Sequence, residues 1–299
     1  MNILDYAKGV ERLVDPMEVG KVHYLQTKMK HLPVFLQRKI VTNAAKKASK
    51  MPFVVEPYCT LLFYEITEPE KMQKFLPVGF RPAKVAVFES GPEKYYGAVT
   101  MFRIHTSVFW GARVEFYLMA ENAETGLLSW IICDYISDTI SYDEKHGLKS
   151  PDVSRGVMTT TCEGDFVCDM TDAGGSKYAR CEMSLIGTKM RALDPRLWIE
   201  GNTSIAYGPL AGEADGDLFS LTFFPEEMKQ ALFVPLNQVR KAETLCGTGK
   251  LGGVLDTVVS FPYAQHMLSD APGQRTHYGD ETKLRATVEK VDFKKIKSL

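Results

Sequence analysis

The sequence predicts an α+β protein that is mainly β, with an antiparallel sheet closed into a barrel or stacked as a sandwich. Short segments rich in aromatic and β-branched residues follow one another from residue 57 onward, as is typical of strands. Helical patterns do not alternate regularly with them, which favours antiparallel pairing. The pattern before residue 52 is helical instead. We therefore expect an N-terminal helical extension over residues 1–51, packed on the body, and a β-barrel domain with peripheral helices over residues 52–299.

The composition fits a globular chain. Its 299 residues are 45% hydrophobic and 24% charged, which is enough to bury a sizeable core. A formal charge of −1 argues against a dedicated nucleic-acid binder. No apolar run approaches the roughly 18 residues of a membrane span, so we predict no stable membrane insertion. The six cysteines are dispersed and no signal peptide is evident, which favours a reduced, cytoplasmic protein.

The first fifty residues hold two predicted helices. Apolar residues at 3-4 spacing predict one over residues 1–20, and Pro33 can begin a second that extends to residue 50. Residues 21–50 carry eight lysines and arginines and no acid. We expect the second helix to dock on the body through an apolar face made of Phe35, Leu36, Ile40, Val41 and Ala44. The alternative is a helix that binds a membrane surface or a partner.

The predicted strands follow in order. They are expected at residues 60–66, 83–90, 95–104, 113–120, 127–136, 156–170 (as a hairpin), 177–187, 203–208, 217–224 and 256–264. Short helices are expected at residues 68–77 and 225–233, each with proline and acidic residues near its start. "CGTGKLGG" lacks the first glycine and the final Ser or Thr of a phosphate loop, and we read it as a turn. The histidines form no ligand pattern, so neither a metal nor a cofactor is predicted.

Several segments between Thr60 and Asp194 occur in the order of one enzyme family. The strand "LLFYEI" precedes "PEKMQKFLPVGFRP", and "YYGAVTMFRIHTSVFWGARVEFYLMA" then supplies a strand pair with a glutamate. "YISDTISYDEKHGLKSPD", "TTTCEGDFVCDM" and "RCEMSLIGTKMRALD" come next. In this order the chain resembles the acetoacetate decarboxylase superfamily. The resemblance implies an antiparallel acetoacetate decarboxylase-like β-barrel, a homo-oligomer, and a cavity for a small organic acid or ketone.

The resemblance also implies site residues. In that family a lysine of a Pro-Lys-Lys motif forms a Schiff base with the substrate ketone, and the iminium withdraws electrons as carbon dioxide leaves. Glutamates and an arginine handle the carboxylate and the proton. Glu115 matches the strand glutamate, and Arg113 lies two residues earlier, on the same strand face. Glu144 matches a second glutamate, and Lys149 is the candidate nucleophile.

The sequence departs from the family pattern around Lys149. Lys149 falls in the proline column, Ser150 in the nucleophile column and Pro151 in the second-lysine column. A one-residue slip, absorbed by a bulge, would bring Lys149 to the nucleophile position. Without burial or a cationic neighbour, an amine keeps a pKa near about 10.4 and is mostly protonated at neutral pH. The alternative interpretation of Lys149 is a solvated loop lysine.

Three functions follow as hypotheses. The first is a decarboxylase-like carbon–carbon lyase acting on a small keto acid or related carboxylate. The second is a small-molecule-binding barrel, or an enzyme of different mechanism, without a Schiff base. In either, Trp110 and Tyr117 are candidate substrate-binding residues together with Arg113, although such aromatics could instead be core, and Arg113 with Glu115 a structural ion pair. The third is an assembly or membrane-associated protein and rests on residues 21–50.

Overall fold

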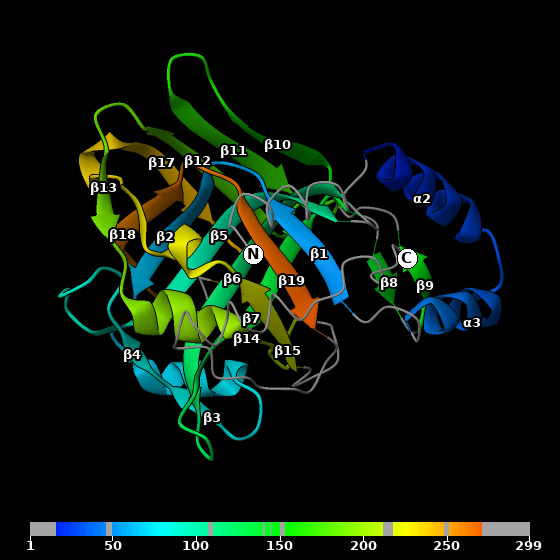
Figure 1. Ribbon diagram of the computed structural model, residues 1–299, viewed down its shortest axis with the longest axis horizontal. Helices are drawn as coiled ribbons and strands as arrows, with labels where there is room; N and C mark the ends of the chain where they lie inside the picture. Colours follow the sequence, from blue (N-terminus) through cyan, green and yellow to red (C-terminus); the bar gives the residue numbers. More distant parts are fainter. Residues whose placement is uncertain are drawn as a thin grey trace.

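The structure is a computed structural model that describes residues 16–45, 50–106, 110–139, 141–143, 145–149, 153–211, 218–247 and 251–270. It is mainly β with few helices, as the sequence predicts (Figure 1). Most of the described strands pair antiparallel, and β14 (Ser204–Tyr207) runs parallel to β7 (Leu128–Ser137). In the described part of the chain, no helix combines the length and the apolar character that a membrane crossing requires.

The largest sheet holds thirteen strands. Twelve follow the order β13-β16-β18-β2-β5-β1-β19-β15-β14-β7-β6-β3, and β4 lies beside β5. The remaining bounds are β1 (Lys50–Val55), β2 (Cys59–Glu65), β3 (Phe80–Pro82), β4 (Lys84–Val85), β5 (Lys94–Thr106), β6 (Trp110–Asn122), β13 (Lys189–Ala192), β15 (Leu218–Phe223), β16 (Gln230–Phe233), β18 (Val254–Phe261) and β19 (Gln265–Asp270). β5 pairs with β2 and β1 on one edge and with β6 on the other. Closure into a barrel stays a prediction.

A second sheet covers the outer face of β2, β5 and β6. It has the order β10-β11-β12-β17, with bounds β10 (Arg155–Thr160), β11 (Asp165–Thr171), β12 (Tyr178–Ser184) and β17 (Val239–Thr244). Phe166 and Met170 on this sheet are buried in one cluster with Val99 and Val114 of the main sheet. Apolar residues alternate along β11 and β12, so each strand buries one face and leaves the other half-buried.

A second buried cluster lies on the inner face of the main sheet. Phe63, Trp130 and Trp198 meet edge to face or tilted, with ring centroids 5.6–6.3 Å apart, and Phe261 stacks edge-on against Trp198 at 5.2 Å. Such pairs contribute roughly 0.5–1.5 kcal/mol each beyond their buried area. Trp198 comes from a π-helical turn (Arg196–Glu200), followed by a 3-10 turn (Gly201–Thr203). These turns cover one side of the inner space.

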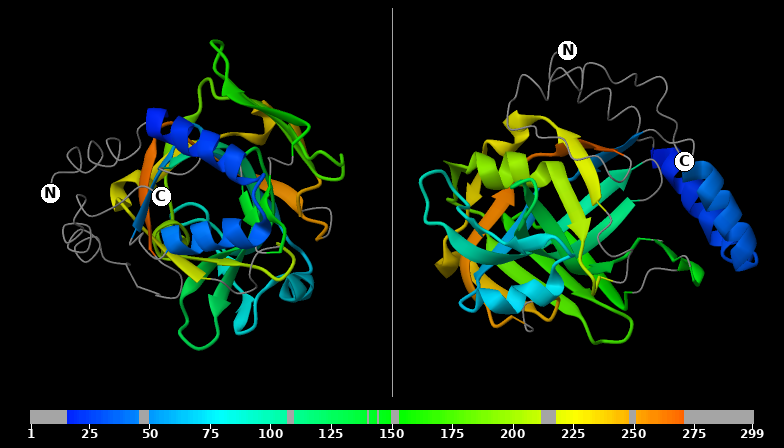
Figure 2. Two further views of the ribbon diagram at one scale, coloured as in Figure 1. Left: turned by 90° about the vertical axis from the view of Figure 1, so that its right-hand side faces the viewer. Right: turned by 90° about the horizontal axis from the view of Figure 1, so that it is seen from below.

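Two helices, α2 (Pro16–Met29) and α3 (Val34–Ala45), project from the body (Figures 1 and 2). A small hairpin of β8 (Ser141–Asp143) and β9 (Gly147–Lys149) lies beside α3. The buried Gln37 joins these parts. Its Nε2 donates to the backbone oxygens of Lys30 (3.2 Å) and Leu32 (2.7 Å), and its Oε1 accepts the Leu148 N–H at 2.6 Å. The α2–α3 loop is thus tied to β9 by polar contacts.

The extension differs from the prediction in two ways. Of the helix predicted over 1–20, residues 1–15 lie outside the described residues, and residues 16–20 begin α2, which runs to Met29. The apolar face predicted to dock is outside instead, because Phe35, Leu36 and Ile40 are 69, 36 and 42% exposed. The position of α3 was predictable from periodicity. Periodicity shows that a helix has an apolar face, but it does not show which surface that face contacts. The division of the chain at residue 51 stays a prediction.

Other predicted elements differ in the structure because strands pair with residues distant in sequence. The helix predicted over 225–233 is wrong: Pro225–Met228 forms a 3-10 turn, and Gln230–Phe233 is strand β16, paired with β13 and β18. The helix predicted at 68–77 is a 3-10 helix over Pro69–Phe75. Strands β1 and β19 were not predicted, yet each pairs on both edges.

Candidate functional site

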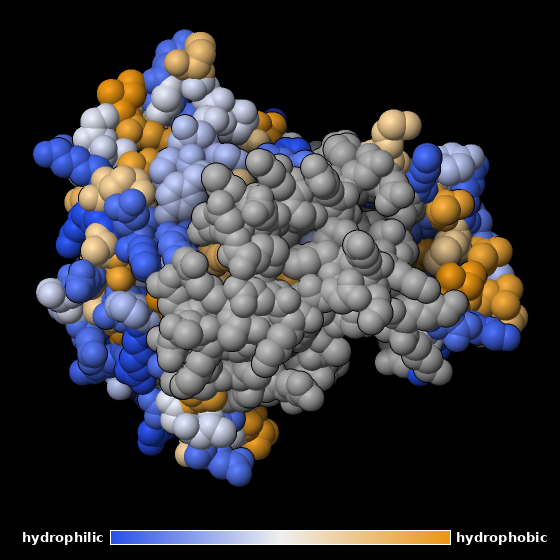
Figure 3. Space-filling view, viewed as in Figure 1, coloured by the Kyte–Doolittle hydropathy of each residue, from blue (hydrophilic) through white to orange (hydrophobic). Residues whose placement is uncertain are grey.

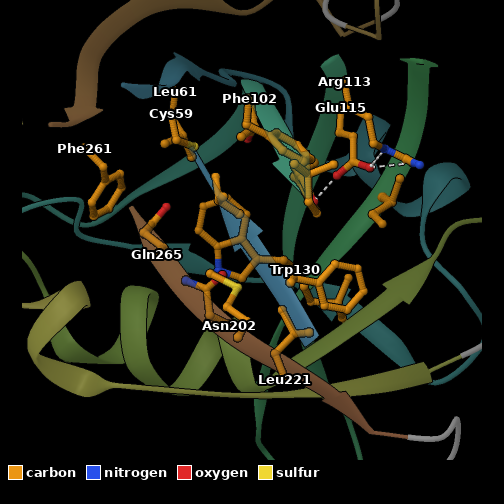
Figure 4. Close-up of a pocket in the computed structure, with 18 of the residues that line it drawn as sticks. Cys59, Leu61, Phe102, Arg113, Glu115, Trp130, Asn202, Leu221, Phe261 and Gln265 are labelled. Carbon is orange, nitrogen blue, oxygen red and sulfur yellow. Dashed lines mark hydrogen bonds and ion pairs between the residues drawn. The ribbon is translucent and has the colours of Figure 1, made fainter. Parts of the chain in front are cut away.

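A cavity of about 350 Å³ lies on the inner face of the main sheet. Its wall is mostly apolar and aromatic and includes Trp198. Figure 4 shows Trp130 and Phe261 on different sides of it. Strands from both ends of the described chain contribute, including β1, β2, β5, β6, β7 and β19. A largely apolar, concave space with a few polar groups is the usual form of a small-molecule site.

Strand β6 supplies the charged part of the wall. Arg113, Glu115 and Tyr117 occupy alternate positions and therefore share the inner face. The residues between them, Val114 and Phe116, are buried on the outer face. The strand thus buries both faces, and its sequence is apolar at every outward position along this stretch.

A register shift in β7 completes this wall. Glu115 pairs with Tyr135 and Tyr117 with Ile132, so β7 carries one extra residue between these pairs. A bulge of this kind changes which face the following residues occupy. Ile132 therefore lines the cavity before the shift, and after it the Tyr135 ring lies 5.0 Å from the Arg113 guanidinium.

The centre of the site is the buried Glu115 carboxylate. Oε1 accepts a hydrogen bond from Arg113 Nε at 2.7 Å, with Arg113 Nη2 at 2.6 Å, and Oε2 accepts the Tyr117 hydroxyl. The Glu115 side chain is 6% exposed and that of Arg113 15%. Figure 4 shows Arg113 and Glu115 together on one side of the cavity, across from Asn202 and Gln265. A buried charge pair needs such contacts, because each ion has lost its hydration.

The protonation states follow from these contacts. Burial acts to lower the pKa of Arg113, but the Glu115 carboxylate and the neighbouring tyrosines together raise it by more, so the guanidinium stays charged. Burial, and then Glu115, raises the pKa of the Tyr117 phenol well above its usual value, so Tyr117 remains a hydrogen-bond donor. Burial, and then Glu115, raises the pKa of the Cys59 thiol to about 12. Cys59 lines the cavity as a neutral thiol, which is a poor nucleophile.

Other polar side chains line the cavity, among them Asn202, Gln265 and Thr100. Asn202 donates to the Trp198 backbone oxygen at 2.9 Å, and Gln265 Nε2 lies 3.2 Å from the Met228 sulfur. The buried Thr100 hydroxyl has no hydrogen-bond partner within the described part of the chain. Thr100 is directly opposite Glu115 in the β5–β6 ladder. A buried hydroxyl gains most from a ligand that supplies its missing partner.

The predicted site residues have different outcomes. Arg113, Glu115 and Tyr117 lie together in the cavity wall, and the predicted shared strand face is confirmed. Trp110 begins β6, but its side chain is outside the described part of the structure. Glu144 lies outside the described residues. The catalytic roles of all these residues stay predictions.

Lys149 ends strand β9, in the hairpin beside α3. Its backbone pairs with Ser141, and its side chain is outside the described part of the structure. Within that part, the residues that line the cavity include Arg113 as their basic side chain and do not include Lys149. Its role as a Schiff-base nucleophile stays a prediction.

Several cavity residues were missed by sequence reasoning. Thr100 is on a predicted strand, and Cys59 directly precedes the strand predicted over 60–66, so alternation would have placed both had the inner face been known. Trp198 and Asn202 come from irregular turns, for which the sequence carries no periodic signal. Gln265 is on β19, where Gln265 to Leu268 are all buried and no alternation is visible.

The residues that the structure describes contain no group of three or more His, Cys, Asp or Glu side chains placed to hold an ion. The cavity itself contributes one such carboxylate, Glu115, and one such thiol, Cys59.

Comparison with known proteins gives likeness of structure alone. No family model and no curated protein sequence matches the chain. The structure is similar to that of acetoacetate decarboxylase from Legionella pneumophila subsp. pneumophila str. Philadelphia 1, with TM-score 0.42 and 12% identity over 76% of this chain and 88% of that chain. It is also similar to an acetoacetate decarboxylase-like enzyme from Sphingomonas wittichii RW1, with TM-score 0.41 and 9% identity over 77% and 93%. Likeness at this identity concerns the fold, and the family predicted from the sequence stays a prediction.

Proposed function

We propose that the chain binds a small, mainly apolar ketone or organic acid in the cavity of Arg113, Glu115 and Tyr117. The observation that carries this proposal is a buried charged group within an apolar wall. Arg113 uses Nε and Nη2 toward Glu115, and a guanidinium has five N–H groups, so Nη1 remains for a carbonyl or carboxylate oxygen. The Thr100 hydroxyl, opposite Glu115, supplies a second polar contact.

The strand pairings support the finer proposal of a barrel around this cavity. Pairings lead from β5 through β1, β19, β15, β14 and β7 to β6, and β6 pairs with β5. Such a circuit leaves an interior that can hold one small ligand. The volume of about 350 Å³ is at the small end of typical ligand sites, which favours a compact substrate.

The proposed chemistry begins with orientation. Arg113 would hold the ligand oxygen, and Glu115 would keep Arg113 and Tyr117 fixed in their positions. The charges of Arg113 and Glu115 compensate each other, so the site does not favour a dianion. Exclusion of water by the aromatic wall strengthens each polar contact. A lyase reaction on a keto acid is the finer proposal, and in it the same groups would bind the carboxylate that leaves as carbon dioxide.

Tryptophan fluorescence provides the test, because Trp130 and Trp198 both line the cavity. The chain is titrated with ketones, 2-oxo acids and 3-oxo acids of increasing length. We expect a saturable change in fluorescence with the ligands that fit. Thr100→Val has nearly the same shape and should weaken binding about 3- to 10-fold, which corresponds to a net hydrogen bond.

The controls separate binding from folding. Arg113→Gln should abolish the fluorescence change, whereas Arg81→Gln, which alters an exposed Arg–Glu pair, should preserve it. Thr100→Val should leave the unliganded fold intact, so its result stands even where Arg113→Gln fails to fold. Absence of saturable binding across the series would refute the proposal, as would equal affinity in Thr100→Val and the parent chain.

The second candidate is a Schiff-base lyase that uses Lys149. It is supported by the order of sequence segments around "YDEKHGLKSPD". Incubation with keto acids followed by borohydride reduction should then trap an adduct, and peptide mass spectrometry would locate it. An adduct at Lys149 that is lost in Lys149→Gln would support this mechanism. No adduct in a protein that binds ligand by fluorescence would refute it and leave the first proposal standing.

A further inference from the structure

The helices α2 and α3 carry large apolar side chains on the outside of the molecule. Tyr24 and Leu25 on α2 are 63 and 59% exposed, Leu32 in the connecting loop is 39% exposed, and Phe35 and Ile40 on α3 are 69 and 42% exposed. Figure 3 shows apolar residues gathered over the outer end of these helices, which project from the body in Figure 2. Single exposed apolar residues are ordinary, but such a group marks an interaction surface. We name it the α2–α3 surface.

Basic residues are interleaved with this apolar group. Lys21 and Lys28 on α2 and Arg38 and Lys39 on α3 are exposed. The chain holds 36 bases and 37 acids, and residues 21–50 hold eight bases and no acid, so elsewhere acids outnumber bases by nine. Five of these eight bases, Lys21, Lys28, Lys30, Arg38 and Lys39, lie on α2, α3 and the loop between them, so positive charge gathers on the part that projects. A partner with negative charge and an apolar layer beneath it would complement both properties.

We propose that the α2–α3 surface binds the face of a lipid bilayer that carries anionic headgroups. Phe35 and Leu32, at the turn between the helices, enter the headgroup region, while Lys28 and Lys39 contact the anionic groups. Tyr24, with Lys28 Nζ 5.4 Å from its ring centroid, has the amphipathic character of residues at this depth. A bilayer also accepts a projecting tip without a matching groove.

The alternative binding partner for this surface is a second copy of the chain. Two copies that met through the same face would bring two acid-free basic segments together, and like charges oppose such a contact. The local anchoring also suits a surface that inserts. Gln37 fixes the α2–α3 loop to β9 through polar bonds, so the turn holds its shape while its apolar side chains remain outside.

Vesicle co-sedimentation of the full chain tests the proposal. One set of vesicles is phosphatidylcholine alone, and the other contains about a third phosphatidylserine. We expect binding to the anionic vesicles at least tenfold tighter than to the neutral ones, and weaker binding as salt is added. Phe35→Ser should reduce the affinity about tenfold or more through lost apolar burial. Lys39→Gln should reduce it about fivefold.

Matched variants elsewhere on the surface are the controls. Leu236 is 44% exposed in a 3-10 turn of the body (Leu236–Gln238), so Leu236→Ser should not alter vesicle binding, whereas Leu32→Ser should. Lys189→Gln on β13 is the control for Lys39→Gln. The proposal is overturned if the parent chain does not prefer anionic vesicles, or if Leu32→Ser and Leu236→Ser behave alike. It is equally overturned if Phe35→Ser halves the solution mass by light scattering without changing vesicle binding, which would identify a second copy as the occupant.

Discussion

The buried ion pair of Arg113 and Glu115 should contribute little net free energy to folding, whereas removing only one of its two charges should be costly. Both side chains are buried, and the nitrogens of Arg113 lie 2.6–2.7 Å from one Glu115 oxygen. Removing one partner leaves the other ion without compensation, which costs about 3–5 kcal/mol. We therefore expect Arg113→Met and Glu115→Leu each to lower the free energy of unfolding by about 3–5 kcal/mol.

The double variant Arg113→Met/Glu115→Leu removes both ions. A buried ion pair replaced by apolar residues of similar volume is often close to neutral. The Tyr117 hydroxyl then loses its acceptor, which costs about 1–3 kcal/mol. The double variant should therefore lose only about 1–3 kcal/mol, several kcal/mol less than the two single losses combined.

Urea unfolding, followed by far-ultraviolet circular dichroism, measures all three variants against the parent chain. Arg81→Met is the matched control, since Arg81 pairs with Glu121 at 2.5 Å but is 64% exposed, and it should cause no measurable change. The reasoning is refuted if the double variant loses as much unfolding free energy as the two single variants together. That result would show that Arg113 and Glu115 are each satisfied by other groups or by water.

Three further predictions concern other parts of the chain. Gly247→Ala should destabilise the fold by about 3 kcal/mol or more and Gly126→Ala by about 1–2 kcal/mol in urea unfolding. Both glycines have positive φ, but only at Gly247 would a Cβ clash with a neighbour, the ring of Phe116. Equal losses would contradict this. A hydrogen bond from His105 holds the pKa of Glu56 below its usual 4.5, so the stability due to Glu56 is present above pH 4.5 and lost as the pH falls through the lower folded pKa. Glu56→Gln should accordingly show a shallower loss of unfolding free energy between about pH 5 and 3 than the parent, and an unchanged slope would count against it. Gln37→Ala should accelerate amide exchange in the α2–α3 loop and at residue 148 while leaving the main sheet protected, and unchanged exchange there would exclude the anchoring role.

The strands that carry the charged part of the site were predictable because their pattern is local. Residues 113–120 alternate in a way that places Arg113 and Glu115 on one face, and the structure confirms that face. The mainly β class followed from the same kind of pattern. Neither result required knowledge of which strands pair.

The parts that were missed depend on contacts distant in sequence. Gln230–Phe233 has a composition compatible with helix, and its pairing with β13 and β18 makes it a strand. β19 is buried on both faces, so alternation does not mark it. Trp198 reaches the cavity from a turn whose position is set by the surrounding core. The exposed state of Phe35 has the same origin, because periodicity finds an apolar face but not its partner.

The extra residue in β7 changes which residue numbers, even or odd, face the inner side of the sheet. Up to Ile132 the even-numbered residues face the cavity, and after the bulge the odd-numbered Tyr135 packs against the inner cluster, beside Arg113. A relative that lacked one residue between Ile132 and Tyr135 would pair with β6 without a bulge, and the tyrosine would stay opposite Glu115. The loss of a single codon here would therefore remove the local bend of the strand and leave the charge of the cavity wall unchanged. Alignments across this point are informative about the site only when they place the gap.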